Sequence, residues 1–465
     1  MLPTSMAPAQ RVASLFSAVT SAMQPARFPL ALLAVLLISA LAPMVDLAGG
    51  SKFGPRGFSG GALTESEQAL DEQRALSAAR RFAGLEVAEL EATPEGTDAV
   101  APEPSLSQLA AAVREATARR IEEIESATEG SPTDFRDSEV RRIRQSAASV
   151  MRQIEEAGPR GVATVFLENE RLAIKQTVNA VFKLDPEGFV TGVLSAVFSV
   201  PAAAIRAEPV IFPLALVVIL ASLSVFGGGI CRMAAVHAGR GGRLSVLEGS
   251  GFVRARVLNL VAIPVLPIAL FALIAVVMLA FALLLQIPVL NLVSGILFVI
   301  PLAVALLGAI LALVALAAAP LMPAAVAVED CDAGDAITRS CALVLSRPLL
   351  WLCVLAIGIV ALALGSILVT GVLTLGSNAF STILALAGGD AGAVIATGDK
   401  AMIATLSGPD RLVAFFLSFW IGLFEAVGAA YAFSLTFDLA TRSYLFMRER
   451  IDGESPSTVS GYGIG

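Results

Sequence analysis

Histidine is nearly absent from this chain of 465 residues, in which His237 is the only one. Cysteine is scarce as well: the four are Cys231, Cys331, Cys341 and Cys353, and no two of them form a Cys-x-x-Cys pair. Zinc and haem sites take their ligands from sets of these residue types at short spacings. We therefore expect no metal ion and no cofactor. Because all four cysteines lie in the hydrophobic part of the chain, we also expect no disulfide framework.

Charged residues are also few. They make up 15% of the chain, whereas soluble domains usually carry about a quarter. Hydrophobic residues reach 56%, and the mean hydropathy is +0.79. This composition predicts an integral membrane protein. The net charge of -7 argues against a nucleic-acid partner.

The familiar catalytic motifs are missing too. The chain has no P-loop and no His-Glu-x-x-His sequence. A Gly-x-Ser-x-Gly pattern occurs at residues 57–61, but it follows no predicted strand, and we interpret it as a linker. We therefore predict no catalytic residue and a protein that is not an enzyme.

What the chain does have is long apolar stretches. About 20 apolar residues suffice for a helix to cross a bilayer, and the sequence predicts six such helices. The first, residues 28–48, is either a cleaved signal peptide or a retained anchor. We expect the anchor, because Pro43 directly follows its best cleavage pattern. Residues 209–445 are expected to form a membrane domain of five spans. These spans are predicted near residues 209–231, 257–285, 292–319, 349–373 and 412–439.

Residues 49–187 are charged and rich in helix-favouring residues, so they predict a helical domain, either a bundle or a hairpin. The clearest helix follows a Ser-Pro-Thr-Asp start signal at residues 131–134. Its apolar residues then recur three and four positions apart, which is typical of one buried helix face. They are Val140, Ile143, Ala147, Val150 and Ile154.

Residues 188–208 predict an amphipathic helix that lies in the membrane interface. Apolar residues line one face of this segment, and Thr191, Ser195 and Ser199 lie on the other. The alternative is that the segment spans the membrane. The protein would then have seven spans, and everything after the segment would take the opposite orientation.

Arginine sets the expected orientation, because positive residues near the ends of spans stay in the cytoplasm. The loop after the second span has five arginines and the tail after the last span has three, whereas the hairpin at residues 286–291 has none. The N-terminal segment 1–27 and the tail 446–465 are therefore predicted to be cytoplasmic. The helical domain then lies on the outer side.

Three stretches of the chain resemble an uncharacterised family of bacterial multi-pass membrane proteins, distantly similar to the membrane domain of some glycerophosphodiester phosphodiesterases. They are residues 227–235, which read Gly-Gly-Gly-Ile-Cys-Arg-Met-Ala-Ala and lead to 245–256, residues 323–348, and residues 430–454. The resemblance implies a bacterial cytoplasmic membrane and a fold with cytoplasmic elbow helices. It implies no activity, because the phosphodiesterase catalytic domain has no counterpart here.

The residues of these stretches agree with elbow helices. Ser245 and Glu248 have the spacing of a capping box, and Asp332 is placed to open a second helix. We expect four arginines on or beside these helices to contact lipid phosphates. They are Arg254, Arg256, Arg339 and Arg347. The alternative is that the elbow helices only order the loops.

Glu425 is the candidate intramembrane polar site, because it lies in the last predicted span and a carboxylate in lipid is costly. The alternative is that a neutral Glu425 hydrogen-bonds across a close helix contact at Gly422, Ala426 and Ala430.

Two functions of the protein remain open. One is a non-enzymatic scaffold or membrane-organising component that binds lipids and has a protein partner through its outer domain. The other is a transporter or channel-like component that uses Glu425. The sequence leaves the oligomeric state open.

Overall fold

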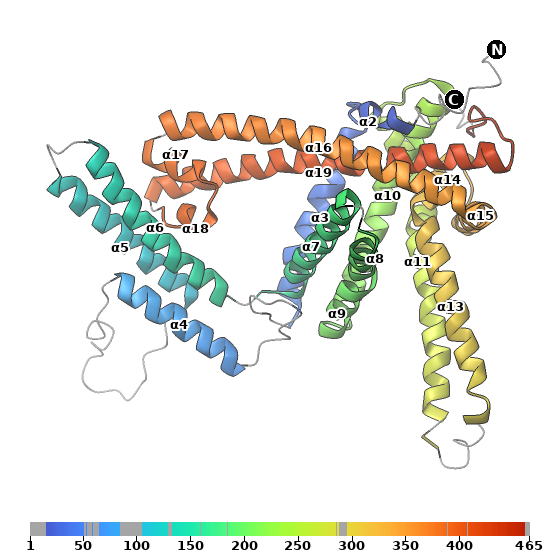
Figure 1. Cartoon of the computed structure of the whole chain (residues 1–465), viewed down its shortest axis with the longest axis horizontal. Coiled ribbons are helices and arrows are strands. Elements are labelled where there is room, and N and C mark those ends of the chain that lie inside the picture. The colour runs from blue at the N-terminus through green and yellow to red at the C-terminus, as the bar shows by residue number, and fades with distance from the viewer. Residues whose placement is uncertain are drawn as a thin grey trace. The chain divides into compact units, whose positions relative to one another are not determined.

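The computed structural model describes residues 15–50, 53, 58, 65–83, 105–128, 133–158, 160–183, 185–284, 286–287, 295–387, 389–406 and 408–460. These residues form helices, as expected for an all-α protein, and Phe53 and Arg160 make an isolated β-bridge (Figure 1). Most of the Gly-x-Ser-x-Gly pattern and most of the predicted turn at 286–291 lie outside the described residues, as do residues 1–14.

The chain divides into two compact units. Unit 1 comprises residues 1–40, 214–371 and 426–465, and unit 2 comprises residues 41–213 and 372–425. Each unit is therefore assembled from segments that are far apart in the sequence. Helices α3, α10, α16 and α19 contribute residues to both units.

Seven helical segments in the described part of the chain are long and apolar enough to cross a membrane, which indicates a multi-pass membrane protein. Six of them coincide with the six predicted spans, and the additional one is Pro186–Ala207. The segments are α3 (Phe28–Ala48), α8 to α9 (Pro186–Ala207), α10 (Ile211–Arg240), α11 (Val246–Leu284), α13 to α14 (Val299–Glu329), α16 (Pro348–Ala387) and α19 (Gly408–Ile451).

Pro201 does not interrupt the additional segment, which closely matches the helix predicted at 188–208. Helix α8 (Pro186–Leu194) is joined to α9 (Val200–Ala207) by a π-helical turn, η3 (Ser195–Ser199). The amide of Val200 donates to the carbonyl of Ser195, five residues back. This wider turn directly precedes Pro201, which has no amide hydrogen and needs room for its ring. The helix therefore continues through the proline.

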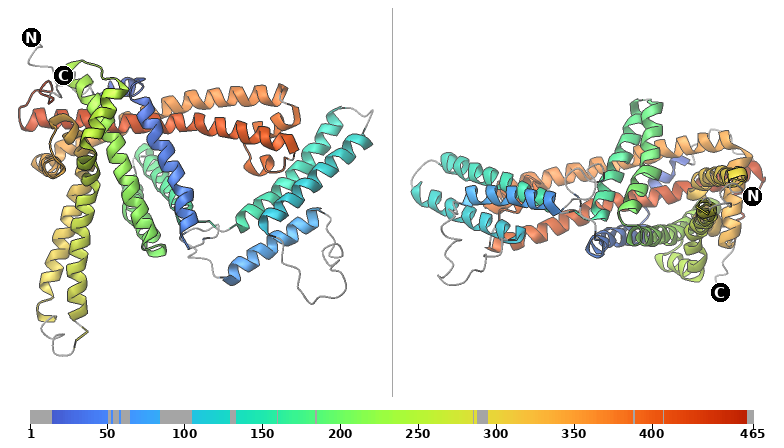
Figure 2. Two further views of the ribbon diagram at one scale, coloured as in Figure 1. Left: turned by 180° about the vertical axis from the view of Figure 1, so that it is seen from behind. Right: turned by 90° about the horizontal axis from the view of Figure 1, so that it is seen from below.

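Helix α8 packs against α7 (Val162–Lys183) as a tight hairpin, visible in both views (Figures 1 and 2). A Cβ added to Gly192 would lie 2.4 Å from the Thr177 hydroxyl and 2.9 Å from the Thr177 amide nitrogen. At Gly188 an added Cβ would lie 3.2 Å from the Cβ of Ala180. Residues four apart share a helix face, so these two glycines form one small-residue stripe that lets the backbones approach.

Helices α4 (Glu65–Ala83), α5 (Leu106–Ala127) and α6 (Thr133–Ala157) form a three-helix bundle. Four of the five apolar residues predicted to line one face of α6 are buried, namely Val140, Ala147, Val150 and Ile154. Of these, Ala147, Val150 and Ile154 belong to the bundle core. The sequence left a bundle and a hairpin open, and the described residues form a bundle. Residues from α18 (Lys400–Ile403) and just after it join the same core, where Ala401 is 2% exposed.

Both predicted elbow helices are present. The Ser245 amide donates to Glu248 Oε2 at 2.7 Å, and the Glu248 amide donates to Ser245 Oγ at 3.3 Å, which completes the capping box. The backbone of α11 leaves helical geometry at Arg256, so an elbow precedes the long apolar part. Asp332 caps α15 (Ala333–Ser346) by accepting from the Asp335 amide at 2.9 Å.

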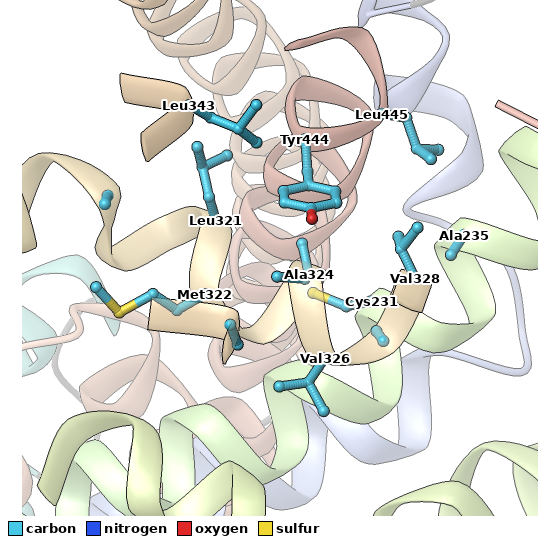
Figure 3. Packing of buried hydrophobic residues seen from close by; sticks show 14 of the residues in the cluster. Cys231, Ala235, Leu321, Met322, Ala324, Val326, Val328, Leu343, Tyr444 and Leu445 are labelled. Atoms are coloured by element: carbon cyan, nitrogen blue, oxygen red, sulfur yellow. The ribbon is translucent and has the colours of Figure 1, made fainter. Parts of the chain in front are cut away.

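The core of unit 1 surrounds α14 (Met322–Glu329), in which every residue from 322 to 328 is buried. This helix continues α13 (Val299–Ala318) through the short turn η4 (Ala319–Leu321). Figure 3 shows Leu321, Val326 and Val328 among side chains from α10, α15 and α19. The labelled neighbours are Cys231, Ala235, Leu343, Tyr444 and Leu445.

Helices α16 and α19 are longer than the spans predicted for them. They contain 40 and 44 residues, which at about 1.5 Å per residue is roughly twice the ~30 Å of bilayer hydrocarbon. The predicted span ending near residue 373 therefore continues as helix to Ala387. In the described part of the segment between the two helices, residues 389–406, the helices are the short α17 (Gly389–Ala396) and α18.

Replacing Gly192 by alanine should destabilise the α7 to α8 hairpin by about 1–3 kcal/mol, because the new methyl group would meet the α7 backbone. Thermal unfolding of the detergent-solubilised protein, followed by circular dichroism, measures the effect. Gly422→Ala is the control, because a Cβ there meets nothing within 4 Å. Equal melting temperatures for the two variants would contradict the close packing.

Candidate functional site

The structure places Glu425 on an exposed face of α19. It does not line either of the two cavities described below. A Cβ added to Gly422 would meet no atom within 4 Å, so the close helix contact that the sequence suggested at this glycine is not seen among the described residues. Glu425 is thus an exposed carboxylate in an apolar segment.

The four arginines proposed to contact lipid phosphates fall into two pairs. Arg256 pairs with Asp330 at 2.8 Å, and Arg339 pairs with Glu329, so these two arginines hold the elbow helices to the end of α14. Arg254 and Arg347 are exposed, and neither forms an ion pair with any residue that the structure describes. The second pair is therefore available to a ligand or a lipid surface.

A polar pocket of about 520 Å³ lies where α14 ends and α15 begins in unit 1. All its lining side chains are polar, and they come from α14, the turn between α14 and α15, α15, α19 and the segment that follows α19. They are Glu329, Cys331, Asp335, Thr338, Arg339, Arg448, Thr458 and Ser460. Of these residues, sequence reasoning had proposed only Arg339 for a functional contact.

Glu329 is the central charge of this pocket, and its side chain is 8% exposed. One carboxylate oxygen lies 3.6 Å from Nε of Arg448 and also accepts a hydrogen bond from the Tyr444 hydroxyl. The other oxygen pairs with Arg339. A buried carboxylate is costly unless it is paired and hydrogen-bonded, and here two guanidiniums and a phenol satisfy it.

The segment after α19 forms one wall of the pocket. The Ser460 amide donates to the Val328 carbonyl at 2.9 Å, and Arg448 Nη2 donates to Thr458 Oγ1 at 3.1 Å. Arg232, on α10, connects α14 to the segment after α19 by donating to the carbonyls of Ala327 and Ser460, each at 2.8 Å. These bonds fix Thr458 and Ser460 beside the end of α14.

A second buried ion cluster joins the N-terminal part of unit 1 to α19. Arg27 is fully buried, and its Nη1 lies 3.1 Å from Oδ2 of Asp438. Arg442 Nε donates to the other oxygen of Asp438 at 3.3 Å, and Arg442 also donates to Ser17 and Ser21. Burial lowers the pKa of Arg27, and the Asp438 carboxylate opposes that shift. The cluster links residues 17–27 to the C-terminal part of α19. None of its residues lines either of the two cavities.

The groups of the pocket suit binding through charge and hydrogen bonds. Burial raises the pKa of the Cys331 thiol to about 11, so at neutral pH it is a thiol and not the nucleophilic thiolate. His237 does not line the pocket. In the described part of the chain, no group of three or more histidine, cysteine or acidic residues could hold a metal ion.

No family model, no curated protein and no solved structure matches this chain.

Asp438→Asn should destabilise the protein by about 3–5 kcal/mol, because it leaves the buried guanidinium of Arg27 without its carboxylate. Denaturant unfolding in detergent measures the loss. Asp410→Asn serves as the matched control, since Asp410 is exposed on the same helix. If both variants unfold at the same denaturant concentration, the buried cluster does not stabilise the fold.

In a variant that keeps Cys331 as its only cysteine, alkylation by iodoacetamide at pH 7.5 should be slow. A thiol pKa of about 11 leaves roughly a hundredfold less thiolate at that pH than the pKa of about 9 usual for cysteine. The rate should rise about tenfold per pH unit up to about pH 10. The same variant unfolded in dodecyl sulfate is the control. Fast alkylation of the folded protein at pH 7.5 would rule out the protected thiol.

Proposed function

We propose that this chain is a non-enzymatic, multi-pass membrane protein that holds a rigid helical module at a membrane surface, where the module organises other components. The observation that carries the proposal is the completion of the bundle core by the connection between α16 and α19. Ala401, Met402 and Ala404 from this connection pack with the core of α4, α5 and α6.

This contact makes the module suitable as a scaffold. A domain attached by one flexible linker reorients freely, whereas this bundle is docked onto a second segment of the chain. Arg152 on α6 also pairs with Asp399 beside α18, at 3.5 Å. Hydrophobic and ionic contacts therefore support the docking together. The connection belongs to two apolar helices that are long enough to cross a membrane.

The bundle also offers a place for a partner. A cavity of about 410 Å³ opens among its three helices. Its lining combines apolar and basic groups, with the Arg120 guanidinium 4.8 Å from the centre of the Phe82 ring. The other lining residues are Ala78, Arg81, Ser146, Val150 and Gln153. A protein segment with an acidic and an apolar side chain would complement this surface.

We further propose that the segment Pro186–Ala207 lies in the interface and that six helices cross. The reason is its packing along α7, which carries Glu168, Glu170, Arg171 and Lys175. If the segment crossed the bilayer, α7 would bring these charges into lipid at high cost. With six spans, the arginine bias supports cytoplasmic termini and an outer bundle.

The family resemblance favours a bacterial cytoplasmic membrane. Arg254 and Arg347, both exposed beside elbow helices, suit contacts with lipid phosphates.

Site-directed photo-crosslinking in cells tests the scaffold. A photoreactive residue at Ser146 or Gln153, which line the bundle cavity, should give a discrete protein adduct, and the same residue at exposed Arg243 should not. Ala401→Asp should abolish the adduct, because a carboxylate cannot remain in the bundle core. Ala393→Asp, at an exposed position of α17, should preserve it.

A second candidate is a transporter or channel-like component, favoured by the exposed carboxylate of Glu425 in an apolar segment. Solute flux through liposomes that contain the purified protein distinguishes the two functions. If the liposomes show solute flux that Glu425→Gln abolishes, and if no adduct forms at Ser146 or Gln153, the protein is a transporter and not a scaffold.

A further inference from the structure

The polar pocket of unit 1 combines charges of both signs. Arg339 and Arg448 supply two guanidiniums, and Glu329 and Asp335 supply two carboxylates. Thr338, Thr458 and Ser460 add hydroxyl groups, which donate or accept hydrogen bonds. A simple anion in this pocket would meet two carboxylates, and a simple cation would meet two guanidiniums. A ligand that carries both charges satisfies both sets.

One donor in the pocket is not fully used by the protein. The Arg448 side chain is 6% exposed, and its Nη atoms already donate to Glu454 and Thr458. Its Nε has no hydrogen-bond acceptor among the described residues, with the nearest Glu329 oxygen at 3.6 Å. Buried donors in proteins nearly always have a partner. Because this Nε atom is buried, an anionic oxygen in the pocket would supply the missing partner once the Arg448 side chain turns toward it.

The location of the pocket indicates the kind of ligand. Glu329 ends the candidate span Val299–Glu329, and Arg448 lies in the last turn of the candidate span Gly408–Ile451. The ends of spans lie at the depth of lipid headgroups. Arg339 is 48% exposed, so the pocket is open to a ligand at this depth. Its volume of about 520 Å³ suits a small molecule.

We propose that this pocket binds a group in which a phosphate neighbours a primary ammonium, supplied either by a zwitterionic phospholipid or by free phosphoethanolamine. Arg339, Arg448 and Thr338 hold the phosphate, and Asp335 holds the ammonium. Glu329 keeps Arg448 in place from behind. The proposal does not depend on the scaffold role of the bundle, because all these residues belong to unit 1.

Calorimetric titration of the purified full-length protein in detergent tests the site. The probes are dihexanoyl phosphatidylethanolamine, dihexanoyl phosphatidylglycerol, phosphoethanolamine and inorganic phosphate. We expect the ethanolamine lipid or phosphoethanolamine to bind more tightly than phosphatidylglycerol and inorganic phosphate. Tighter binding of the lipid assigns the source to the membrane, and equal or tighter binding of phosphoethanolamine assigns it to solution.

Two substitutions connect the binding to the pocket. Arg339→Gln and Asp335→Asn should each weaken it about tenfold, which is typical for the loss of one charge-assisted hydrogen bond. Arg450→Gln should leave it unchanged, because Arg450 is exposed on the same turn as Arg448 but does not line the pocket. Asp335 is exposed, so Asp335→Asn remains informative if Arg339→Gln fails to fold. Phosphatidylglycerol that binds as tightly as the ethanolamine lipid would overturn the proposal, as would binding that neither variant weakens.

Discussion

Two buried carboxylates, Asp438 and Glu329, each pair with two arginines, and unit 1 depends on these pairings. Asp438 holds Arg27 and Arg442, and Glu329 holds Arg339 and Arg448. Three of these six residues lie on α19. Because a buried charge without a partner is strongly destabilising, the segments that carry the partners must meet there. The ion pairs therefore bring the N-terminal part of unit 1, the second elbow and the last helix together.

The apolar helices add little packing of their own. Large residues such as Leu273 on α11 and Leu302 on α13 are 61% exposed. These two helices lie side by side in both views of Figure 2, and their outward leucines suit lipid better than water. Between helices in lipid there is no hydrophobic driving force. The specific contacts of unit 1 therefore gather at the polar ends of the helices, where the pocket also lies.

Local patterns in the sequence predicted local structure well. The capping box at Ser245 and the cap at Asp332 form as expected, since a cap involves residues three apart. The buried face of α6 follows from helical periodicity in the same way. The π-helical turn that carries the helix past Pro201 has no such local signal in the sequence. Helices α16 and α19 extend beyond the predicted spans. In α16 the extension is itself apolar, and in α19 it carries arginines.

The sequence by itself determined that this is an apolar, helical protein with elbow helices and a charged helical segment, because composition, caps and periodicity act over a few residues. Only the tertiary structure decided which charges meet. Arg27 and Asp438 are distant in the chain, and so are Glu329 and Arg448, and nothing in their local sequence indicates that they pair. The pocket and the docking of α18 onto the bundle have the same origin, since both consist of contacts between remote segments.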